Sequence, residues 1–319
     1  YTLRNLEITR NLRDGGKKGT LFAVLDFTHT AMGTRLLRKW LEYPLMNIAS
    51  INKRLDAVGE LKENFLLRQQ LQEACKNIYD FERLLTRIEV GSANARDLVA
   101  LRSSFQALPA IRSSLEQCQA GLLQGCHREI HLYDELADLL EQAIVDDPAL
   151  TIREGGIIKD GYNEELDQYR QIAHNSKQLL QAMEEQEKEK TGIRALKIGY
   201  NKVFGYYIEV SNSFKDQVPD TYIRKQTLVN GERYITQELK DLEQEILTAG
   251  ERDNALEYEL FSALRDEICA GAERIQKTAA AVAELDTLAS LAVVAVKNSY
   301  CCPVGDDSVV ALELSLLPT

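Results

Sequence analysis

The chain has 319 residues, of which 45% are hydrophobic and 27% are charged, and its formal net charge at pH 7 is −11. This composition is ordinary for a globular protein with a sizeable core, and the length predicts one large domain or about two domains. The acidic balance excludes a surface that nucleic acid coats all over, so any contact with DNA must be local.

The sequence also indicates the cellular compartment of the protein. No run of eighteen apolar residues and no charged-then-apolar leader occurs, and we therefore expect neither a secreted nor a membrane-spanning protein. Six cysteines are scattered along the chain, and none forms a Cys-x-x-Cys pair. This spacing favours reduced thiols in a cytosolic protein over a disulfide framework.

Long helical patterns dominate the first half of the chain, where glycine and proline rarely interrupt them. Apolar residues recur at helical spacing over Thr34–Tyr43, Ile51–Asn64, Phe65–Gly91 and Ala95–Phe105. A further helix is predicted over Leu132–Val145, because Asp146-Asp147-Pro148 is a clear stop signal. Arg153–Ile158 then predicts a short strand or a turn.

Two very long helices are predicted in the second half. The first begins near Asn163, a good N-cap residue that two glutamates follow, and it runs to about Lys190, with Gly192 as its stop signal. The second begins around Thr236 and meets no proline until Pro303. The points where this second helix can bend or break are Gly250 and Gly271.

The stretch Leu196–Ile235 differs from its surroundings, because its residues alternate as they do in β-strands. Leu196–Tyr200 and Gly205–Ser211 predict one hairpin, with a turn at Asn201-Lys202. Tyr222–Leu228 and Arg233–Ile235 predict a second hairpin around Val229-Asn230-Gly231, since Asn-Gly tolerates positive φ. The predicted fold class is mostly α: a long-helix lever or bundle domain with a small inserted antiparallel β domain.

The charge of this stretch indicates a nucleic-acid surface. Arg194 to Ile235 holds seven Lys or Arg residues and four acidic ones, a net charge of +3. Cations and amides on turns suit a surface that follows phosphates without reading bases. An alternative is that the lysines only protect strand edges from aggregation. The candidate DNA-binding residues are Asn201, Lys202, Arg224, Lys225, Asn230 and Arg233.

Other candidate features have simpler structural explanations. The glycine and lysine spacing of Gly15–Thr20 does not fit a phosphate-binding loop, so a plain loop is predicted. The acidic run Glu184–Lys190 is predicted to be mainly a solvated helix face. Tyrosines in the β stretch are expected to pack the sheet rather than to stack on bases. These tyrosines are Tyr200, Tyr206, Tyr207, Tyr222 and Tyr234.

No catalytic or metal site is predicted. The sequence lacks the usual nucleophile, phosphate-loop and zinc-protease motifs. One metal candidate can be weighed, but its spacing fits no compact zinc module. Its residues are Cys118, Cys126, His127 and His131.

Several strings resemble the MutS family of DNA mismatch-repair proteins, and they follow the family's order from Tyr1 to about Pro303. The most specific lie in the β stretch: Leu196–Asn201 with Phe204–Ile208, and Arg224–Leu228 with Glu232-Arg233-Tyr234. The others are Arg4–Ile8, Thr30–Leu37, Trp40-Leu41, Asp80–Leu85, Gly161–Asp167 and Ala283–Ala292.

The resemblance implies the central piece of a bacterial mismatch-repair protein. It implies a lever (core) domain at 1–190 and 237–303, an inserted β clamp at 191–236, and a tail at 304–319 towards an ATPase domain absent from this chain. In that family the clamp holds the backbone of double-stranded DNA, and the lever carries conformational signals to the ATPase domain. We therefore expect no enzyme and no cofactor in this chain, with ATP and Mg bound in the ATPase domain.

The resemblance also implies the partners: double-stranded DNA, a second copy of the family protein and a MutL-type protein, with no membrane. The implied location is the bacterial cytoplasm, at the nucleoid. The alternative is a structural helical scaffold whose hairpin domain binds a protein partner. That alternative predicts DNA binding that is absent or insensitive to Lys202 and Asn230.

Overall fold

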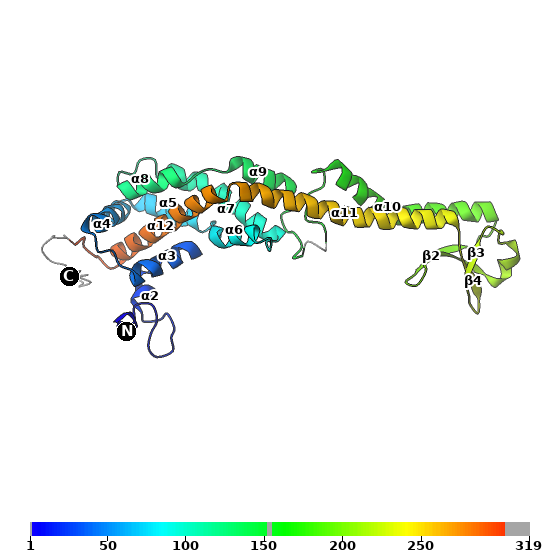
Figure 1. Ribbon diagram of the computed structural model, residues 1–319, viewed down its shortest axis with the longest axis horizontal. Coiled ribbons are helices and arrows are strands. Elements are labelled where there is room, and N and C mark those ends of the chain that lie inside the picture. Colours follow the sequence, from blue (N-terminus) through cyan, green and yellow to red (C-terminus); the bar gives the residue numbers. More distant parts are fainter. Residues whose placement is uncertain (1, 152–154, 304–319) are drawn as a thin grey trace. The chain divides into compact units, whose positions relative to one another are not determined.

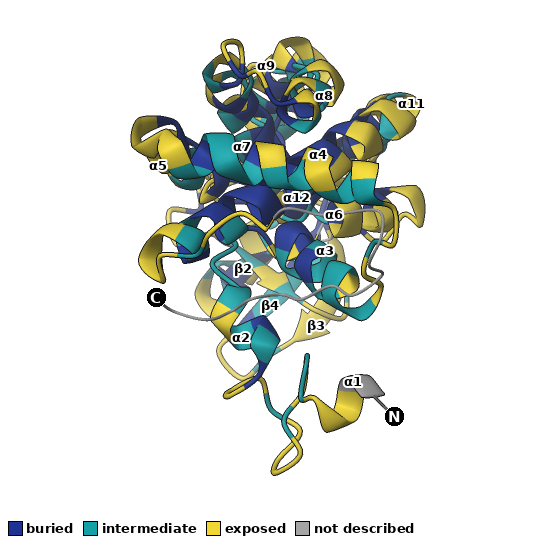
Figure 2. Ribbon diagram, turned by 90° about the vertical axis from the view of Figure 1, so that its left-hand side faces the viewer, coloured by how far each residue is buried: buried dark blue, intermediate teal, exposed yellow. Residues whose placement is uncertain are grey.

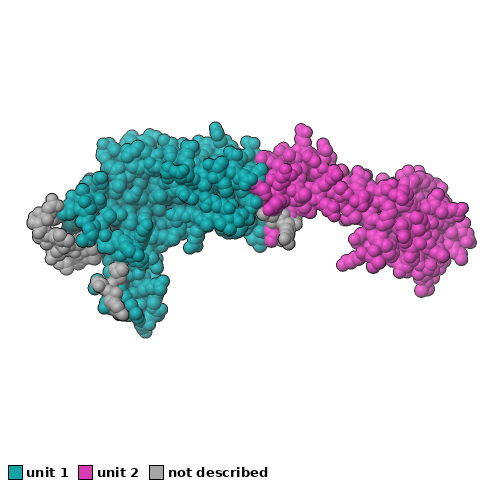
Figure 3. Space-filling model, viewed as in Figure 1, with its two compact units in different colours: residues 1–150, 263–319 teal, residues 151–262 magenta. Residues whose placement is uncertain are grey.

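The computed structural model describes residues 2–151 and 155–303. It divides into two compact units, unit 1 with residues 1–150 and 263–319 and unit 2 with residues 151–262 (Figure 3). Helices occur in both units, and a four-stranded sheet lies in unit 2 (Figure 1). The predicted fold class, mostly α with a small antiparallel β insertion, is confirmed. The functional boundaries at 190/191 and 236/237 stay predictions, because compactness alone does not test them.

Unit 1 is helical, and its predicted helices are confirmed with two differences. Phe65–Gly91 forms two helices, because the Asp80 carboxylate caps a new helix by accepting a hydrogen bond from the Arg83 N–H (3.3 Å). The helix predicted over Ala95–Phe105 continues to Ser114, and Pro109 lies inside it without ending it. The helices of this unit are α1 (Thr2–Asn5), α2 (Leu21–Leu25), α3 (Ala31–Glu42), α4 (Ile48–Glu63), α5 (Phe65–Cys75), α6 (Phe81–Glu89), α7 (Ala95–Ser114), α8 (Gly121–Glu129), α9 (Asp134–Ala143), α12 (Ala272–Lys297) and the end of α11 (Gln237–Ala270).

Helix α12 forms the core of unit 1. Leu285, Leu288 and Val294 on it are fully buried, and Figure 2 shows α12 largely in dark blue among its neighbours. Of the described helices, α12 alone is long and apolar enough to cross a membrane, but 72% of its apolar window is buried inside the protein. Packing against α3, α4 and α8 accounts for this composition.

A buried carboxylate joins α12 to the start of α3. Asp286, which is 2% exposed, accepts hydrogen bonds from the backbone N–H of His29 (3.0 Å) and Thr30 (2.8 Å) and from the Thr30 hydroxyl (2.7 Å). A Cβ at Gly33 would clash with the same carboxylate. Burial raises the pKa of Asp286, and the donors offset part of that effect. The distant strings Thr30–Leu37 and Ala283–Ala292 therefore meet at one buried contact.

Unit 2 contains α10 (Glu164–Thr191) and the beginning of α11. The Asn163 side chain caps α10 by accepting a hydrogen bond from the Leu166 N–H (3.0 Å), and Gly192 ends the helix with a φ of 72°. Both ends agree with the sequence prediction. Helix α11 continues through Gly250, and the long predicted helix breaks only at Gly271.

A second buried carboxylate fixes α10 and α11 to the chain that precedes them. Glu257 on α11 is 1% exposed and accepts hydrogen bonds from the backbone N–H of Gly156 (2.9 Å), Ile157 (2.7 Å) and Ile158 (2.9 Å). Arg170 on α10 pairs with the same carboxylate at 2.7 Å. The described part of the predicted element Arg153–Ile158 is thus a segment held by one side chain, while residues 153 and 154 lie outside the described residues.

The sheet of unit 2 has the strand order β1-β2-β4-β3, and all neighbouring strands are antiparallel. The strands are β1 (Lys197–Asn201), β2 (Gly205–Ser211), β3 (Ile223–Thr227) and β4 (Gly231–Ile235), with a short 3₁₀ helix at Asn212–Gln217. Both predicted hairpins are confirmed. One face of the sheet packs with Leu180 and Met183 of α10 and Leu239 of α11 around a buried cluster. The sheet thus rests on both long helices.

The Asn230-Gly231 turn forms, but not for the predicted reason. The Leu228 N–H donates to the Gly231 carbonyl oxygen (2.8 Å), which closes the hairpin. Neither Asn230 nor Gly231 has a positive φ. Gly231 is required instead because a Cβ there would lie 2.6 Å from the Val210 carbonyl oxygen on β2. The need for glycine arises from the neighbouring strand, which local sequence does not reveal.

We expect Glu257→Gln to destabilise unit 2 by about 2 kcal/mol, because it removes a buried charge that Arg170 and three backbone donors satisfy. Hydrogen exchange should show faster exchange of the Gly156, Ile157 and Ile158 amides. Glu259→Gln, an exposed neighbour on the same helix, is the control and should change stability by less than about 0.5 kcal/mol. Equal effects of the two variants would contradict this role of Glu257.

Two glycine-to-alanine variants should change the free energy of unfolding in opposite directions. Gly231→Ala should destabilise the protein by about 1–3 kcal/mol, because its Cβ meets the Val210 carbonyl oxygen. Gly250→Ala should stabilise it by about 0.5–1 kcal/mol, since this site lies inside α11 and its Cβ meets no atom within 4 Å. Urea unfolding measures both, and stabilisation by Gly231→Ala would refute the packing explanation.

Candidate nucleic-acid interface

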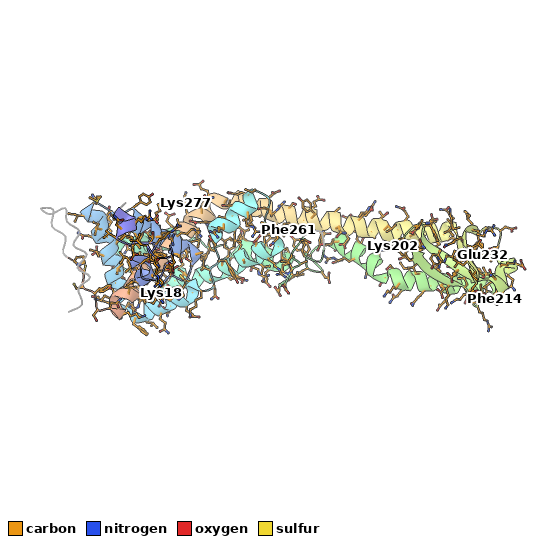
Figure 4. The ribbon with its side chains drawn as sticks, turned by 90° about the horizontal axis from the view of Figure 1, so that it is seen from below. Lys18, Lys202, Phe214, Glu232, Phe261 and Lys277 are labelled. Carbon is orange, nitrogen blue, oxygen red and sulfur yellow. The ribbon has the colours of Figure 1, made fainter. Side chains whose placement is uncertain are left out.

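The two hairpin turns lie at opposite ends of the sheet. Strand β2 begins at Gly205, directly after the first turn, and ends at Ser211, which pairs with Gly231 at the second turn. Six residue steps of about 3.3 Å separate the turns by about 20 Å along β2. Figure 4 shows Lys202 and Glu232 apart on the sheet in agreement with this register. The sequence predicted both turns but not their relative placement.

The first turn presents an amide and an ammonium group. The Asn201 side-chain oxygen accepts a hydrogen bond from the Val203 N–H (2.7 Å), which leaves the amide N–H₂ free to donate. Lys202 is exposed and has no hydrogen-bond or ion-pair partner among the described residues. Val203 beside it is 89% exposed. The turn therefore offers two donors to a ligand outside the protein.

Helix α11 fixes the base of this turn. Glu243 is buried and accepts a hydrogen bond from the Tyr206 N–H (3.0 Å), while Lys240 pairs with Glu243 (2.5 Å) and donates to the Phe204 carbonyl oxygen (3.0 Å). Gly205 has a φ of 81°, and a Cβ on it would overlap the Glu243 carboxylate. The turn is consequently held in place by a polar contact that no local motif predicted.

The second turn is held by Asn212, which follows β2. Its side-chain N–H₂ donates to the Val229 carbonyl oxygen (2.9 Å), and its backbone N–H donates to the Asn230 carbonyl oxygen (3.2 Å). These bonds use only backbone atoms of the turn, so the exposed Asn230 side chain stays available. Val229 at the tip is 92% exposed. Both turns thus combine a fixed backbone with exposed donors.

Arg224 and Lys225 have different surroundings on β3. Arg224 pairs with Glu232 on β4 (3.2 Å), and Glu232 also accepts a hydrogen bond from the Tyr234 hydroxyl (2.5 Å). Lys225 lies at a register shift between β3 and β4, a β-bulge. It is exposed, and its ammonium group has no hydrogen-bond or ion-pair partner within the described part of the chain. Lys225 is therefore the more available of the two cations.

Arg233, like Arg224, has its charge engaged within the sheet, and it makes several contacts there. Its Nε lies 2.9 Å from the Glu209 carboxylate, and one Nη donates to the Gln226 side-chain oxygen (3.0 Å). The guanidinium stacks 4.2 Å from the centre of the Tyr207 ring. That ring in turn covers Gly199, where a Cβ would lie 2.7 Å from it. This arrangement braces the outer face of the sheet.

The acidic run on α10 contains two residues that the sequence prediction misassigned. Glu184 accepts a hydrogen bond from the Ile198 N–H (2.9 Å) on the edge strand β1. Glu187 is 3% exposed, accepts a hydrogen bond from the Tyr222 hydroxyl and pairs with Lys190 (3.0 Å). These two carboxylates attach the sheet to α10, so the prediction that they lie on a solvated helix face was wrong. Helical periodicity alone does not distinguish a glutamate that meets a sheet.

The tyrosines pack the sheet, as predicted, except Tyr200, which is mostly exposed. Tyr222 and Tyr234 are buried with ring centres 6.0 Å apart. Burial, together with the Glu232 carboxylate, raises the pKa of Tyr234 to about 12, so its hydroxyl remains a donor. Tyr200, with 60% of its surface exposed, contacts Tyr206 at 5.1 Å between ring centres.

The cysteine and histidine candidates show no metal-binding arrangement. Cys118 and Cys126 are buried, and the Cys126 thiol faces Glu284 at 3.9 Å. Burial raises the pKa of Cys126 to about 12, which keeps the thiol protonated. Across residues 2–151 and 155–303, no three His, Cys, Asp or Glu side chains group in a way that could hold a metal ion.

Comparison with known proteins gives the family. A family described as MutS domain III matches residues 1–292. The chain is 52% identical over 313 residues to the DNA mismatch repair protein MutS of Symbiobacterium thermophilum. This match covers 98% of this chain and 36% of the relative. It is 50% identical over 306 residues to the DNA mismatch repair protein MutS of Methanosarcina mazei, and this match covers 95% of this chain and 34% of the relative. The chain spans about a third of the length of these curated relatives, and it belongs to the MutS family of DNA mismatch-repair proteins, as domain III.

Proposed function

We propose that the sheet of unit 2 is a clamp that holds the phosphate backbone of double-stranded DNA without reading its sequence. One observation carries the proposal. Lys202, Lys225 and Asn230 expose donors that nothing in the described chain satisfies, whereas Arg224 and Arg233 are paired within the sheet. Free cations and amides on the two turns and at the β-bulge suit phosphate oxygens, which carry no sequence information.

The separation of the turns supports contact at two places on one duplex. Their distance of about 20 Å along β2 exceeds the width of either groove of B-DNA, about 12 Å and about 6 Å. The turns would therefore reach phosphates that lie well apart along the duplex. Two separate backbone contacts orient a duplex better than one.

We further propose that α10 and α11 carry movement of the clamp to an ATPase domain outside this chain. Three carboxylates tie the sheet to these helices: Glu184 and Glu187 on α10, and Glu243 on α11. A force on the turns would be passed to the helices, because the connections are hydrogen bonds to backbone and buried side chains. Glu257 joins the same helices at a second point.

We also propose the partners and the cellular location, on the ground that the chain belongs to the MutS family. The partners would be double-stranded DNA, a second copy of the whole protein and a MutL-type protein, in the bacterial cytoplasm at the nucleoid. ATP and Mg would bind outside this chain, whose own residues would act by binding and not by catalysis.

A protein-binding scaffold is the second candidate, and one observation favours it. All five residues of β3 are exposed, and β3 is an edge strand. An exposed edge can pair with a strand of another protein. Deletion of the cationic side chains would leave this form of binding intact.

Removal of a free lysine should lower the salt dependence of DNA binding. We expect Lys202→Ala, and separately Lys225→Ala, to reduce the slope of log K against log salt by about 0.9, with equal losses of affinity on different sequences. Fluorescence anisotropy over a salt series measures the slope. Lys177→Ala, an exposed lysine on α10, is the control and should change nothing. Losses that depend on the DNA sequence would contradict contact with the backbone alone.

Arg233 should behave differently, since its guanidinium braces the sheet. We expect Arg233→Met to lower the free energy of unfolding by about 1–2 kcal/mol through loss of the Glu209 pair and the Tyr207 stack. The salt slope should stay at the wild-type value. A slope that falls by about 0.9 with unchanged stability would instead make Arg233 a phosphate ligand.

A further inference from the structure

A basic loop projects from unit 1 between α1 and α2, and we call residues Arg10–Gly19 the N-terminal loop. Figures 1 and 2 show it extending away from the helices of that unit. The Asn11 N–H donates to the Gly16 carbonyl oxygen (2.9 Å), and the Asn11 side chain donates to the Lys18 carbonyl oxygen (3.0 Å). Gly15 and Gly19 adopt positive φ values of 71° and 84°. The predicted loop at Gly15–Thr20 is confirmed, and its own hydrogen bonds define its shape.

The loop is strongly cationic within an acidic chain. The loop contains one carboxylate, Asp14, and four cations: Arg10, Arg13, Lys17 and Lys18. Its net charge is therefore +3, against −11 for the whole chain. Arg10, Arg13 and Lys18 are exposed, and their side chains have no hydrogen-bond or ion-pair partner among the described residues. Figure 4 labels Lys18 in this loop.

The nearby carboxylates do not neutralise these three cations. Asp14 accepts a hydrogen bond from the Gly16 N–H (2.8 Å), and Glu7 accepts one from the Leu12 N–H (2.6 Å). Asp26 pairs with Lys17 at 2.5 Å. The acidic groups are thus used to build the loop, and three cations remain for a ligand.

We propose that the N-terminal loop is a second surface for the phosphate backbone of duplex DNA, separate from the clamp. The guanidinium groups of Arg10 and Arg13 present forked donors that match phosphate oxygens, and the Lys18 ammonium adds a third charge. Contact with phosphates releases counterions and needs no base recognition. The hydrogen bonds of the loop limit the entropy that binding would otherwise cost.

The chemistry of the loop favours nucleic acid over an acidic protein segment. Protein interfaces contain a desolvated apolar or aromatic centre. Leu12, 56% exposed, is the one large apolar side chain of the loop. Three unpaired cations around a single leucine suit a hydrated polyanion, and the chain's own family acts on DNA.

The test compares two triple variants that change net charge equally. The loop variant is Arg10→Gln with Arg13→Gln and Lys18→Gln. The control variant removes three exposed cations elsewhere in unit 1, and it consists of Lys53→Gln, Arg128→Gln and Lys277→Gln. Binding of each to a 30-base-pair homoduplex, a length chosen to be about three helical turns, is measured over a salt series. Both triples are also made in a clamp variant with Lys202→Ala and Lys225→Ala, and circular dichroism checks that every variant is folded.

For the loop variant, we expect the slope of log K against log salt to fall in magnitude by about 2–3 and binding at low salt to weaken at least about tenfold. The control variant should bind like the wild-type protein. Residual binding of the clamp variant should disappear when the loop triple is added. Equal effects of both triples, an unchanged loop variant, or no binding of the wild-type protein at low salt would each overturn the proposal. If the lysine substitutions in the clamp change nothing while the loop triple weakens binding, the clamp proposal fails and this one stands.

Discussion

Buried carboxylates that project from long helices and accept backbone N–H groups hold the rest of this structure in place. Asp286 fixes the start of α3 in unit 1, and Glu257 fixes Gly156–Ile158 in unit 2. Glu243 does the same for the first hairpin. A carboxylate can accept several bonds at once, and a buried one is costly unless it does so. Each of these contacts therefore selects one arrangement of helix and loop.

The same principle explains which cations remain free. Carboxylates of the sheet and its helices neutralise Arg224, Arg233 and Lys240 at short range. Lys202 and Lys225 lie on a turn and at a bulge, where no strand partner places a carboxylate opposite them. The net charge of +3 over residues 194–235 is thus less informative than its distribution. Position on the sheet divides the cations that are paired within the structure from those that stay exposed without a partner.

Local patterns predicted the elements well and the contacts between them poorly. Period-two alternation located both hairpins, and Asn163 and Gly192 marked the ends of α10, because these signals reside in neighbouring residues. The placement of the two turns at opposite ends depends on β2 pairing with β4, which no local signal encodes. The attachment of Glu187 to Tyr222 was missed for the same reason. The strings at Thr30–Leu37 and Ala283–Ala292 indicated the family, and only the structure showed that they meet, through Asp286.

The measurement that tests the central claim most directly is the affinity of this chain for a homoduplex and for the same duplex with one mismatch, each over a salt series. A clamp that holds only phosphates predicts equal affinities for the two duplexes, with a steep fall as salt rises. A preference for the mismatched duplex, or the absence of binding even at low salt, would contradict a backbone clamp.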